Sequence, residues 1–129
     1  MIEDIHHILE GALTQSGASV AAVVDREGTL LDCAVQILAD LESWCIELAL
    51  VVPRVESFCS ASAEDLVEFW IGTAHWTWMV RPMAGAWLLI MAQSQNLPAG
   101  RMRFGACTTA VSLAPLLAAA ELDAPGAAH

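Results

Sequence analysis

The chain has 129 residues, a net charge of −10 and a hydrophobic fraction of 57%, which suits one domain with one core and excludes a disordered chain. With 15 acidic residues against five basic ones, the charge argues against nucleic acid and anionic membrane surfaces as partners. Charges or turn residues interrupt each apolar run before the about 18 residues of a membrane span, so no membrane insertion is expected, and the surplus apolar surface indicates a protein partner.

The first half of the chain is predicted to form two helices with a hairpin between them. Residues 2–14 carry apolar side chains with a helical period, and Ser16-Gly17 ends that helix. Residues 19–25 and 29–34 are short apolar runs joined by an Asp-Arg-Glu-Gly turn, which predicts a hairpin. Residues 36–52 return to a helical period. Pro53 is expected to kink or end this second helix, although the pattern allows a continuation through Phe58.

The second half is predicted to form three strands and a last helix. Residues 66–71 have a mixed strand pattern. Residues 76–82 and 86–92 flank a small-residue turn, and the second arm has no polar residue, so it must be covered on both faces. A helix follows from Asn96, with Pro115 expected to bend or interrupt it near Leu113. Residues 1–121 are assigned to one domain, and residues 122–129 are expected to form a disordered tail.

The order α-β-β-α-β-β-β-α predicts an α/β sandwich with one sheet of five strands and antiparallel hairpins. The first and third helices can cover one face of the sheet, and the second helix the other. One apolar strip is left over. Ile46 and Leu50, with Pro53 near them, lie off the main apolar face of the second helix, and a single sheet cannot cover both faces.

Three short motifs, placed in this order, are similar to a known family. Ala22-Val23-Val24-Asp25-Arg26-Glu27-Gly28 resembles the first hairpin of the roadblock / dynein light-chain family, and Val80-Arg81-Pro82-Met83-Ala84-Gly85-Ala86-Trp87-Leu88-Leu89 resembles its fourth and fifth strands. Residues 95–101 resemble the start of its last helix. The resemblance covers about residues 2–120. It implies a roadblock-like domain with the sheet order 2-1-5-4-3.

The resemblance also implies a function without chemistry. Bacterial members of the family bind and regulate small Ras-like GTPases, and eukaryotic members link cargo to dynein or scaffold GTPase complexes. The resemblance implies a homodimer, or a pair with a roadblock paralogue, joined by the edge strand after the second helix and by the second helices themselves.

Two candidate surfaces follow from this interpretation. The dimer interface is expected to use the edge strand and the left-over strip: Ile46, Leu50, Pro53, Leu66, Glu68, Trp70 and Ile71. The surface for the GTPase partner is expected on the exposed polar strip of the second helix: Asp40, Ser43, Glu47 and Arg54. Arg54 has two further interpretations, because it could cap the C-terminus of the second helix or complete a GTPase site in trans.

No catalytic constellation is recognisable, so the chain is not expected to be an enzyme. It has no HExxH, GxSxG, P-loop or GxGxxG motif. His6 and His7 are adjacent, so on a helix they point about 100° apart and make poor metal co-ligands. No catalytic residue, cofactor or metal is therefore expected. The four cysteines form no CxxC pair, and the acidic N-terminus is unlike a signal peptide, which favours reduced thiols and a cytoplasmic location.

The alternative function is a small-molecule sensory or binding domain of the PAS or profilin-like kind, which shares the sheet-plus-helix architecture. It predicts a pocket between sheet and helix lined by Trp78, Trp87 and Met91, where the sequence favours a filled core. Trp44 and Trp87 are expected in the core because both lie on apolar faces. Trp70 and Trp76, at or near the edge, stay open between core and interface.

Overall fold

The structure is a computed structural model that describes residues 2–36 and 40–123. Its elements are α1 (Ile2–Ser16), β1 (Val20–Asp25), β2 (Leu30–Val35), α2 (Leu41–Ala61), β3 (Phe69–Gly72), β4 (Trp76–Pro82), β5 (Trp87–Ser94) and α3 (Ala99–Asp123). The predicted order of helices and strands is therefore confirmed.

The five strands form one open sheet in the order β2-β1-β5-β4-β3, and every neighbouring pair is antiparallel. β5 lies at the centre, where Ile90 pairs with Ala22 of β1 on one side and with Val80 of β4 on the other. The two ends of the sheet are β2 and β3. Both the predicted fold class and the predicted order 2-1-5-4-3 are confirmed.

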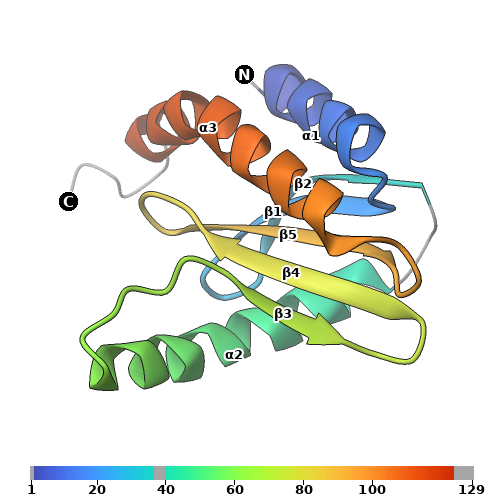
Figure 1. Ribbon diagram of the computed structural model, residues 1–129. Helices are drawn as coiled ribbons and strands as arrows, with labels where there is room; N and C mark the ends of the chain where they lie inside the picture. The colour runs from blue at the N-terminus through green and yellow to red at the C-terminus, as the bar shows by residue number, and fades with distance from the viewer. Residues whose placement is uncertain (1, 37–39, 124–129) are drawn as a thin grey trace.

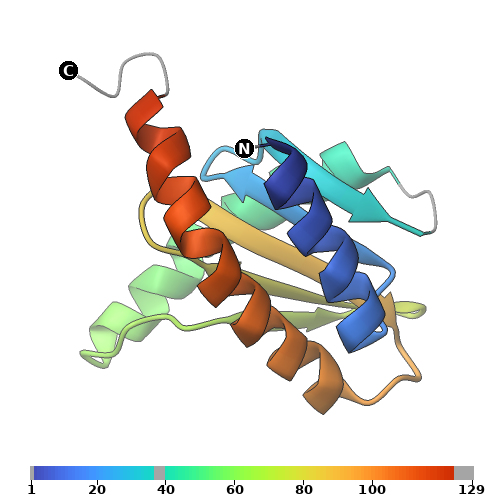
Figure 2. The ribbon, with the colours of Figure 1, turned by 90° about the horizontal axis from the view of Figure 1, so that it is seen from above.

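Helices cover both faces of the sheet. α2 lies on one face, whereas α1 and α3 lie side by side on the other (Figures 1 and 2). Successive residues of β5 point to opposite faces, so Leu89 and Met91 join the core under α1 and α3, and Leu88 and Ile90 join the core under α2. The central strand thus receives the double cover that an all-apolar strand requires.

Both helix prolines lie inside continuous helices, so neither the end expected as one possibility at Pro53 nor the interruption at Pro115 occurs, and α2 continues past Phe58 as the sequence pattern allowed. α2 extends to Ala61 and α3 to Asp123. A proline removes one helical hydrogen bond. In α3, burial of Leu113 before Pro115 and of Leu117 after it opposes a break, whereas in α2 the buried residues Leu48 and Val52 both precede Pro53.

Three other boundaries differ from the sequence expectation. α2 begins at Leu41 rather than near residue 36, and residues 37–39 lie outside the described part of the chain. β3 has only four residues, because residues 66–68 precede the ladder with β4 instead of belonging to it. The predicted disordered tail begins inside α3, which reaches Asp123, and residues 124–129 lie outside the described residues.

α3 is long and apolar enough, by length and composition alone, to cross a membrane. Its window Ala99–Ala120 has 22 residues and a mean hydropathy of 1.3. The expectation that no segment reaches this length is therefore wrong for α3. In the structure, Met102, Ala106 and Leu113 of this helix are buried in the core beneath α1 and α3, although only 33% of the window is buried.

Candidate interaction surfaces

The outer face of α2 carries apolar side chains that no other part of the described chain covers. Ile46 and Leu50 are 47% and 63% exposed, and Pro53 is exposed as well. These three residues, called the α2 strip below, lie on successive turns of the helix. Cys45 and Val52 are buried on the side that faces the sheet. The structure therefore brings together the three α2 residues that the sequence placed in a dimer interface.

The β1–β2 turn fixes the position of α2 on the sheet. Asp25 Oδ1 accepts hydrogen bonds from the backbone N–H groups of Glu27 and Thr29, and Gly28 has a φ of +89°. A Cβ on Gly28 would lie 2.5 Å from the Cα of Ile46, so only glycine lets the turn touch the helix backbone there. The sequence identified this turn as a hairpin, but it did not reveal the contact with α2.

An ion pair adds to this contact between the turn and the helix. Arg26 Nη1 lies 2.8 Å from Glu56 Oε1, which belongs to the second half of α2. Both side chains are partly exposed, so the pair contributes less than about 1 kcal/mol to stability. The close packing at Gly28 is the stronger of the two constraints on the helix.

The predicted interface residues around β3 divide between the two faces of the sheet. Leu66 and Ile71 pack against the core under α2, on the same face as the α2 strip. Trp70 packs against the core under α1 and α3, and Glu68 bonds to a residue of α3. The alternation of a strand would put Leu66 with Glu68 and Trp70, but the strand begins only at Phe69. The structure therefore does not bring all seven predicted interface residues together.

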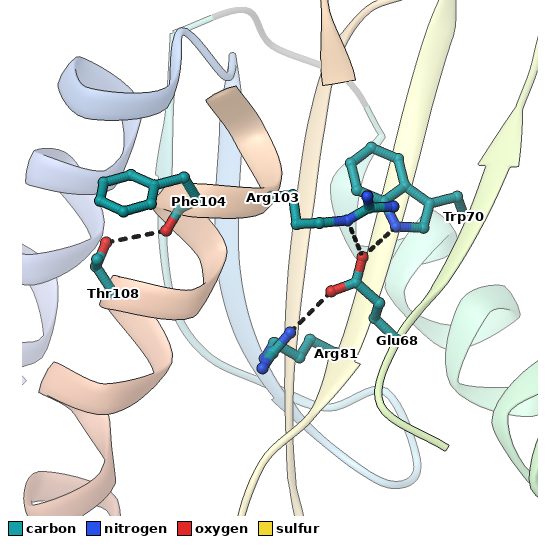
Figure 3. A network of polar contacts seen from close by, with 6 residues as sticks. All are labelled: Glu68, Trp70, Arg81, Arg103, Phe104 and Thr108. Carbon is teal, nitrogen blue, oxygen red and sulfur yellow. Dashed lines mark hydrogen bonds and ion pairs between the residues drawn. The ribbon is translucent and has the colours of Figure 1, made fainter. Parts of the chain in front are cut away.

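Glu68 is the centre of a polar network that joins three elements (Figure 3). Its Oε1 accepts a hydrogen bond from Nη1 of Arg81 on β4 at 2.8 Å. Its Oε2 accepts one from Nε of Arg103 on α3 at 3.0 Å and another from Nε1 of Trp70. The Arg103 guanidinium also lies over the Trp70 ring, 5.1 Å from its centroid. The network ties the start of β3 to β4 and α3.

The surroundings of Glu68 keep its carboxylate charged. Burial by itself raises the pKa of Glu68, whose side chain is 12% exposed. Hydrogen bonds from Trp70 and Arg103 and the charges of Arg103 and Arg81 act in the opposite direction, and the net result is a lowered pKa. The sequence did not single out Arg103, because its partner is distant in the chain and no local motif connects them.

The N-terminal part of α2 has a shallow hollow of about 200 Å³, lined by Asp40, Ser43, Trp44 and Glu47. We call it the acidic hollow. Trp44 stacks on the buried Trp78 with ring centroids 4.7 Å apart and an interplanar angle of 18°. This stacking holds the Trp44 ring in place. The structure therefore brings together Asp40, Ser43 and Glu47, as predicted, and adds Trp44, which the sequence suggested only as a core residue.

Arg54 lies outside the acidic hollow, and its predicted role as the C-terminal cap of α2 is wrong because the helix continues to Ala61. Arg54 is also the one arginine for which the described residues provide no ion pair or hydrogen bond. The other four all have partners: Arg26 pairs with Glu56, Arg81 and Arg103 with Glu68, and Arg101 donates to the carbonyls of Thr14 and Gln15.

The pocket that the alternative function requires is not formed by its predicted residues. Trp78 belongs to the core under α2, whereas Met91 and Trp87 lie with the core under α1 and α3. The sheet therefore separates Trp78 from Met91 and Trp87. A hollow of about 470 Å³ exists elsewhere, between α1 and β2, where His6, Glu10 and Cys33 are among its lining residues.

The described residues offer little for covalent or metal chemistry. Burial, followed by the proximity of Cys33 and Glu42, raises the pKa of Cys45 to about 12, so its thiol stays protonated near neutral pH. Burial also raises the pKa of Cys33, with further contributions from Asp32 and Glu42. Within residues 2–36 and 40–123, no group of three or more His, Cys, Asp or Glu side chains is arranged to hold a metal ion.

The amino-acid sequence matches no protein-family model and no curated protein, but the fold matches solved structures. Myxococcus xanthus MglB has a TM-score of 0.82 and 16% identity, over 92% of this chain and 90% of that chain. A structure of MglB with a tetrameric arrangement has a TM-score of 0.82 and 19% identity, over 88% of each chain. A Roadblock/LC7 domain from Streptomyces avermitilis has a TM-score of 0.79 and 10% identity, over 88% and 98%.

The profilin-like alternative has weaker support from the same comparison. Profilin IA of Acanthamoeba castellanii has a TM-score of 0.62 and 13% identity, over 86% of this chain and 97% of that chain. The resemblance that the sequence motifs indicated thus agrees with the whole architecture. The chain has the fold of MglB and of Roadblock/LC7 domain proteins.

Proposed function

We propose that this chain is a non-catalytic regulatory protein of the cytoplasm that pairs with a second copy, or with a roadblock paralogue, and binds a small Ras-like GTPase. The proposal rests on the exposed α2 strip, together with the position of β3 at one edge of the sheet. The shared fold with MglB and Roadblock/LC7 domain proteins supports the same class of function.

Pairing would remove two features that are unfavourable in a single chain. Covering Ile46 and Leu50 would take apolar surface out of water, at about 25 cal/mol for each Å². Among residues 2–36 and 40–123, no strand lies beside the outer edge of β3, and a second β3 strand would supply one. The tetrameric arrangement of one MglB structure supports self-association as a property of this fold.

The residues of the proposed interface follow from their positions in the structure. The α2 strip, with Leu66 and Ile71, would form its apolar part, because these side chains lie on one face of the sheet. Glu68 and Trp70 are on the other face, engaged with Arg81 and Arg103. Their proposed contribution is to hold β3 in position for pairing.

The acidic hollow is the surface that we propose for the GTPase. Its carboxylates, on a chain with a net charge of −10, suit a partner with a basic contact surface. Trp44 adds a rigid aromatic surface, which is typical of residues that dominate binding energy. The proposal needs no catalytic group from this chain.

Sedimentation equilibrium and a pull-down test the two parts separately. We expect the wild-type protein to be a dimer at micromolar concentration and Leu50→Asp to be a folded monomer, because the new carboxylate would have to be buried unpaired. Val111→Asp is the matched control, since Val111 is 75% exposed on α3 and lies away from α2. A wild-type monomer would refute the pairing. If the dimer retains a small Ras-like GTPase from the same genome in neither the GDP nor the GTP state, the GTPase part is wrong.

A further inference from the structure

We infer that β2 accepts an extended peptide segment of a partner protein as an added strand, and that this segment carries a lysine or arginine opposite Asp32. The site lies at the edge of the sheet away from β3, so the inference does not depend on the proposed pairing of two copies. It assigns a use to the hollow between α1 and β2.

The outer edge of β2 has backbone groups that no strand pairs. In the part of the chain that the structure describes, β1 is the only strand beside β2. The N–H of Gln36 bonds to the carbonyl of Ser19, on the β1 side. Because neighbouring residues of a strand direct these groups to opposite sides, Val35 and Cys33 direct theirs outward. Asp32 Oδ1 accepts the N–H of Cys33 at 2.7 Å, so within the described residues the N–H of Val35 is left for a partner.

The hollow of about 470 Å³ lies along this edge, where residues 33–36 form one wall and α1 forms the other (Figure 2). Ala34 belongs to the core under α1 and α3, and Asp32 Oδ1 lies 3.3 Å from Nδ1 of His6 on α1. Residues of an added strand that stand directly opposite Ala34 and Asp32 would also point toward α1. Gly11 lines the hollow, and a Cβ on it would meet nothing within 4 Å. The hollow therefore has room for the incoming side chains.

The charges at the hollow favour a basic side chain in the added strand. Glu10 lines the hollow, and its Oε1 lies 3.1 Å from Nε2 of His6. Asp32 Oδ2 is buried and has no hydrogen-bond partner among the described residues. A buried carboxylate oxygen without a partner is unfavourable. A lysine or arginine opposite Asp32 would supply the missing donor.

The same charges disfavour a second copy of β2 as the added strand. A second copy would bring its own Asp32 and Glu10 to the hollow, and like charges that face each other across a ladder repel. A basic segment of another protein meets both the backbone edge and the carboxylates. In this mode of recognition, main-chain hydrogen bonds supply affinity and the spaces for alternate side chains supply specificity.

A peptide of sequence TVTRTVT with blocked ends tests the inference on the full-length protein. It reads the same in both directions, so the arginine and the two valines keep their spacing whether the added strand is parallel or antiparallel. Hydrogen exchange followed by NMR should show the amide of Val35 slowed about fivefold or more by millimolar peptide, because it gains an acceptor. The amides of Phe69–Gly72 at the other edge should not change. The peptide TVTETVT should bind about tenfold more weakly, because it replaces an attraction with a repulsion.

Two glycine variants separate strand addition from binding elsewhere. Gly11→Leu puts a side chain into the hollow and should weaken peptide binding about tenfold or more, because the incoming side chains lose their space. Gly100→Leu is the matched control, because a Cβ there also meets nothing within 4 Å but lies at the start of α3. Leucine forms helices better than glycine, so both variants should fold, as circular dichroism can verify. Asp32→Asn should reduce the preference for TVTRTVT over TVTETVT.

Three results would overturn the inference. The first is an exchange rate at Val35 that millimolar TVTRTVT leaves unchanged. The second is equal binding of the arginine and glutamate peptides to the wild-type protein. The third is undiminished binding to Gly11→Leu.

Discussion

Removing the Glu68 carboxylate tests how β3 is held in place. Glu68→Ala would leave Arg81 without its ion pair, and the indole N–H of Trp70 without its acceptor. Breaking a buried pair by removing one partner costs about 3–5 kcal/mol. Arg103 is more than half exposed, so its contact with Glu68 is screened by water and adds little. The expected loss of unfolding free energy is therefore about 2–3 kcal/mol, below the value for a fully buried pair.

Thermal unfolding measured by circular dichroism at fixed protein concentration gives the size of this loss. For a chain of this length, about 3 °C of midpoint temperature corresponds to 1 kcal/mol, so Glu68→Ala should unfold about 6–9 °C below the wild type. Glu64→Ala is the matched control, because Glu64 is exposed in the loop before β3 and should change stability by less than about 0.5 kcal/mol. If the two variants unfold at the same temperature, the network does not stabilise β3.

Three further predictions concern pH, the β1–β2 turn and a buried thiol. The pKa of Glu68 is lowered on folding, so its charge stabilises the protein above the unfolded pKa of 4.5, and this stability is lost as pH falls through the lower folded pKa. In urea titrations, the difference in unfolding free energy between wild type and Glu68→Gln should therefore be constant above pH 4.5 and shrink below it. A difference that does not change with pH would contradict this. Gly28→Ala should lower the unfolding free energy by about 2–5 kcal/mol, because the positive φ costs about 1–2 kcal/mol and the clash with α2 costs about 1–3 kcal/mol. A loss below about 1 kcal/mol in the same titrations would mean that the turn does not touch the helix. Cys45 should resist iodoacetamide at pH 8 until the chain unfolds, because it is buried and has a pKa of about 12; peptide mapping that finds Cys45 modified as fast as the partly exposed Cys59 would contradict its burial.

The central hairpin was predictable because its signal is local. An apolar second arm and a small-residue turn predicted a strand over residues 76–82, and β4 spans Trp76–Pro82. The need for cover on both faces of β5 then predicted the placement of the helices, which the two separate cores confirm. The order of the five strands came from the resemblance to a family.

The failures share a different cause, because each depends on contacts between distant parts of the chain. Local rules end or bend a helix at Pro53 and Pro115, but both helices continue, and around Pro115 the burial of Leu113 and Leu117 outweighs one lost hydrogen bond. A strand pattern that began at Leu66 put Glu68 on the interface side. The ladder begins three residues later, and Glu68 instead meets Arg103, which lies 35 residues away in sequence.

The candidate surfaces were predictable where they lie on one helix. The period of α2 alone placed Ile46, Leu50 and Pro53 on a strip that the sheet does not cover, and it placed Asp40, Ser43 and Glu47 together. It did not show that Trp44 lines the hollow, because that position depends on stacking against Trp78 from the sheet. Sequence periodicity therefore identifies a surface more readily than the residues that hold it.

Sedimentation equilibrium of the wild-type protein at micromolar concentration tests the central claim most directly. A chain that pairs through the α2 strip and β3 should sediment at twice its chain mass of 13.7 kDa, and Leu50→Asp should sediment at the chain mass while keeping its circular dichroism spectrum. A wild-type protein that stays at 13.7 kDa across the concentration range would contradict the account.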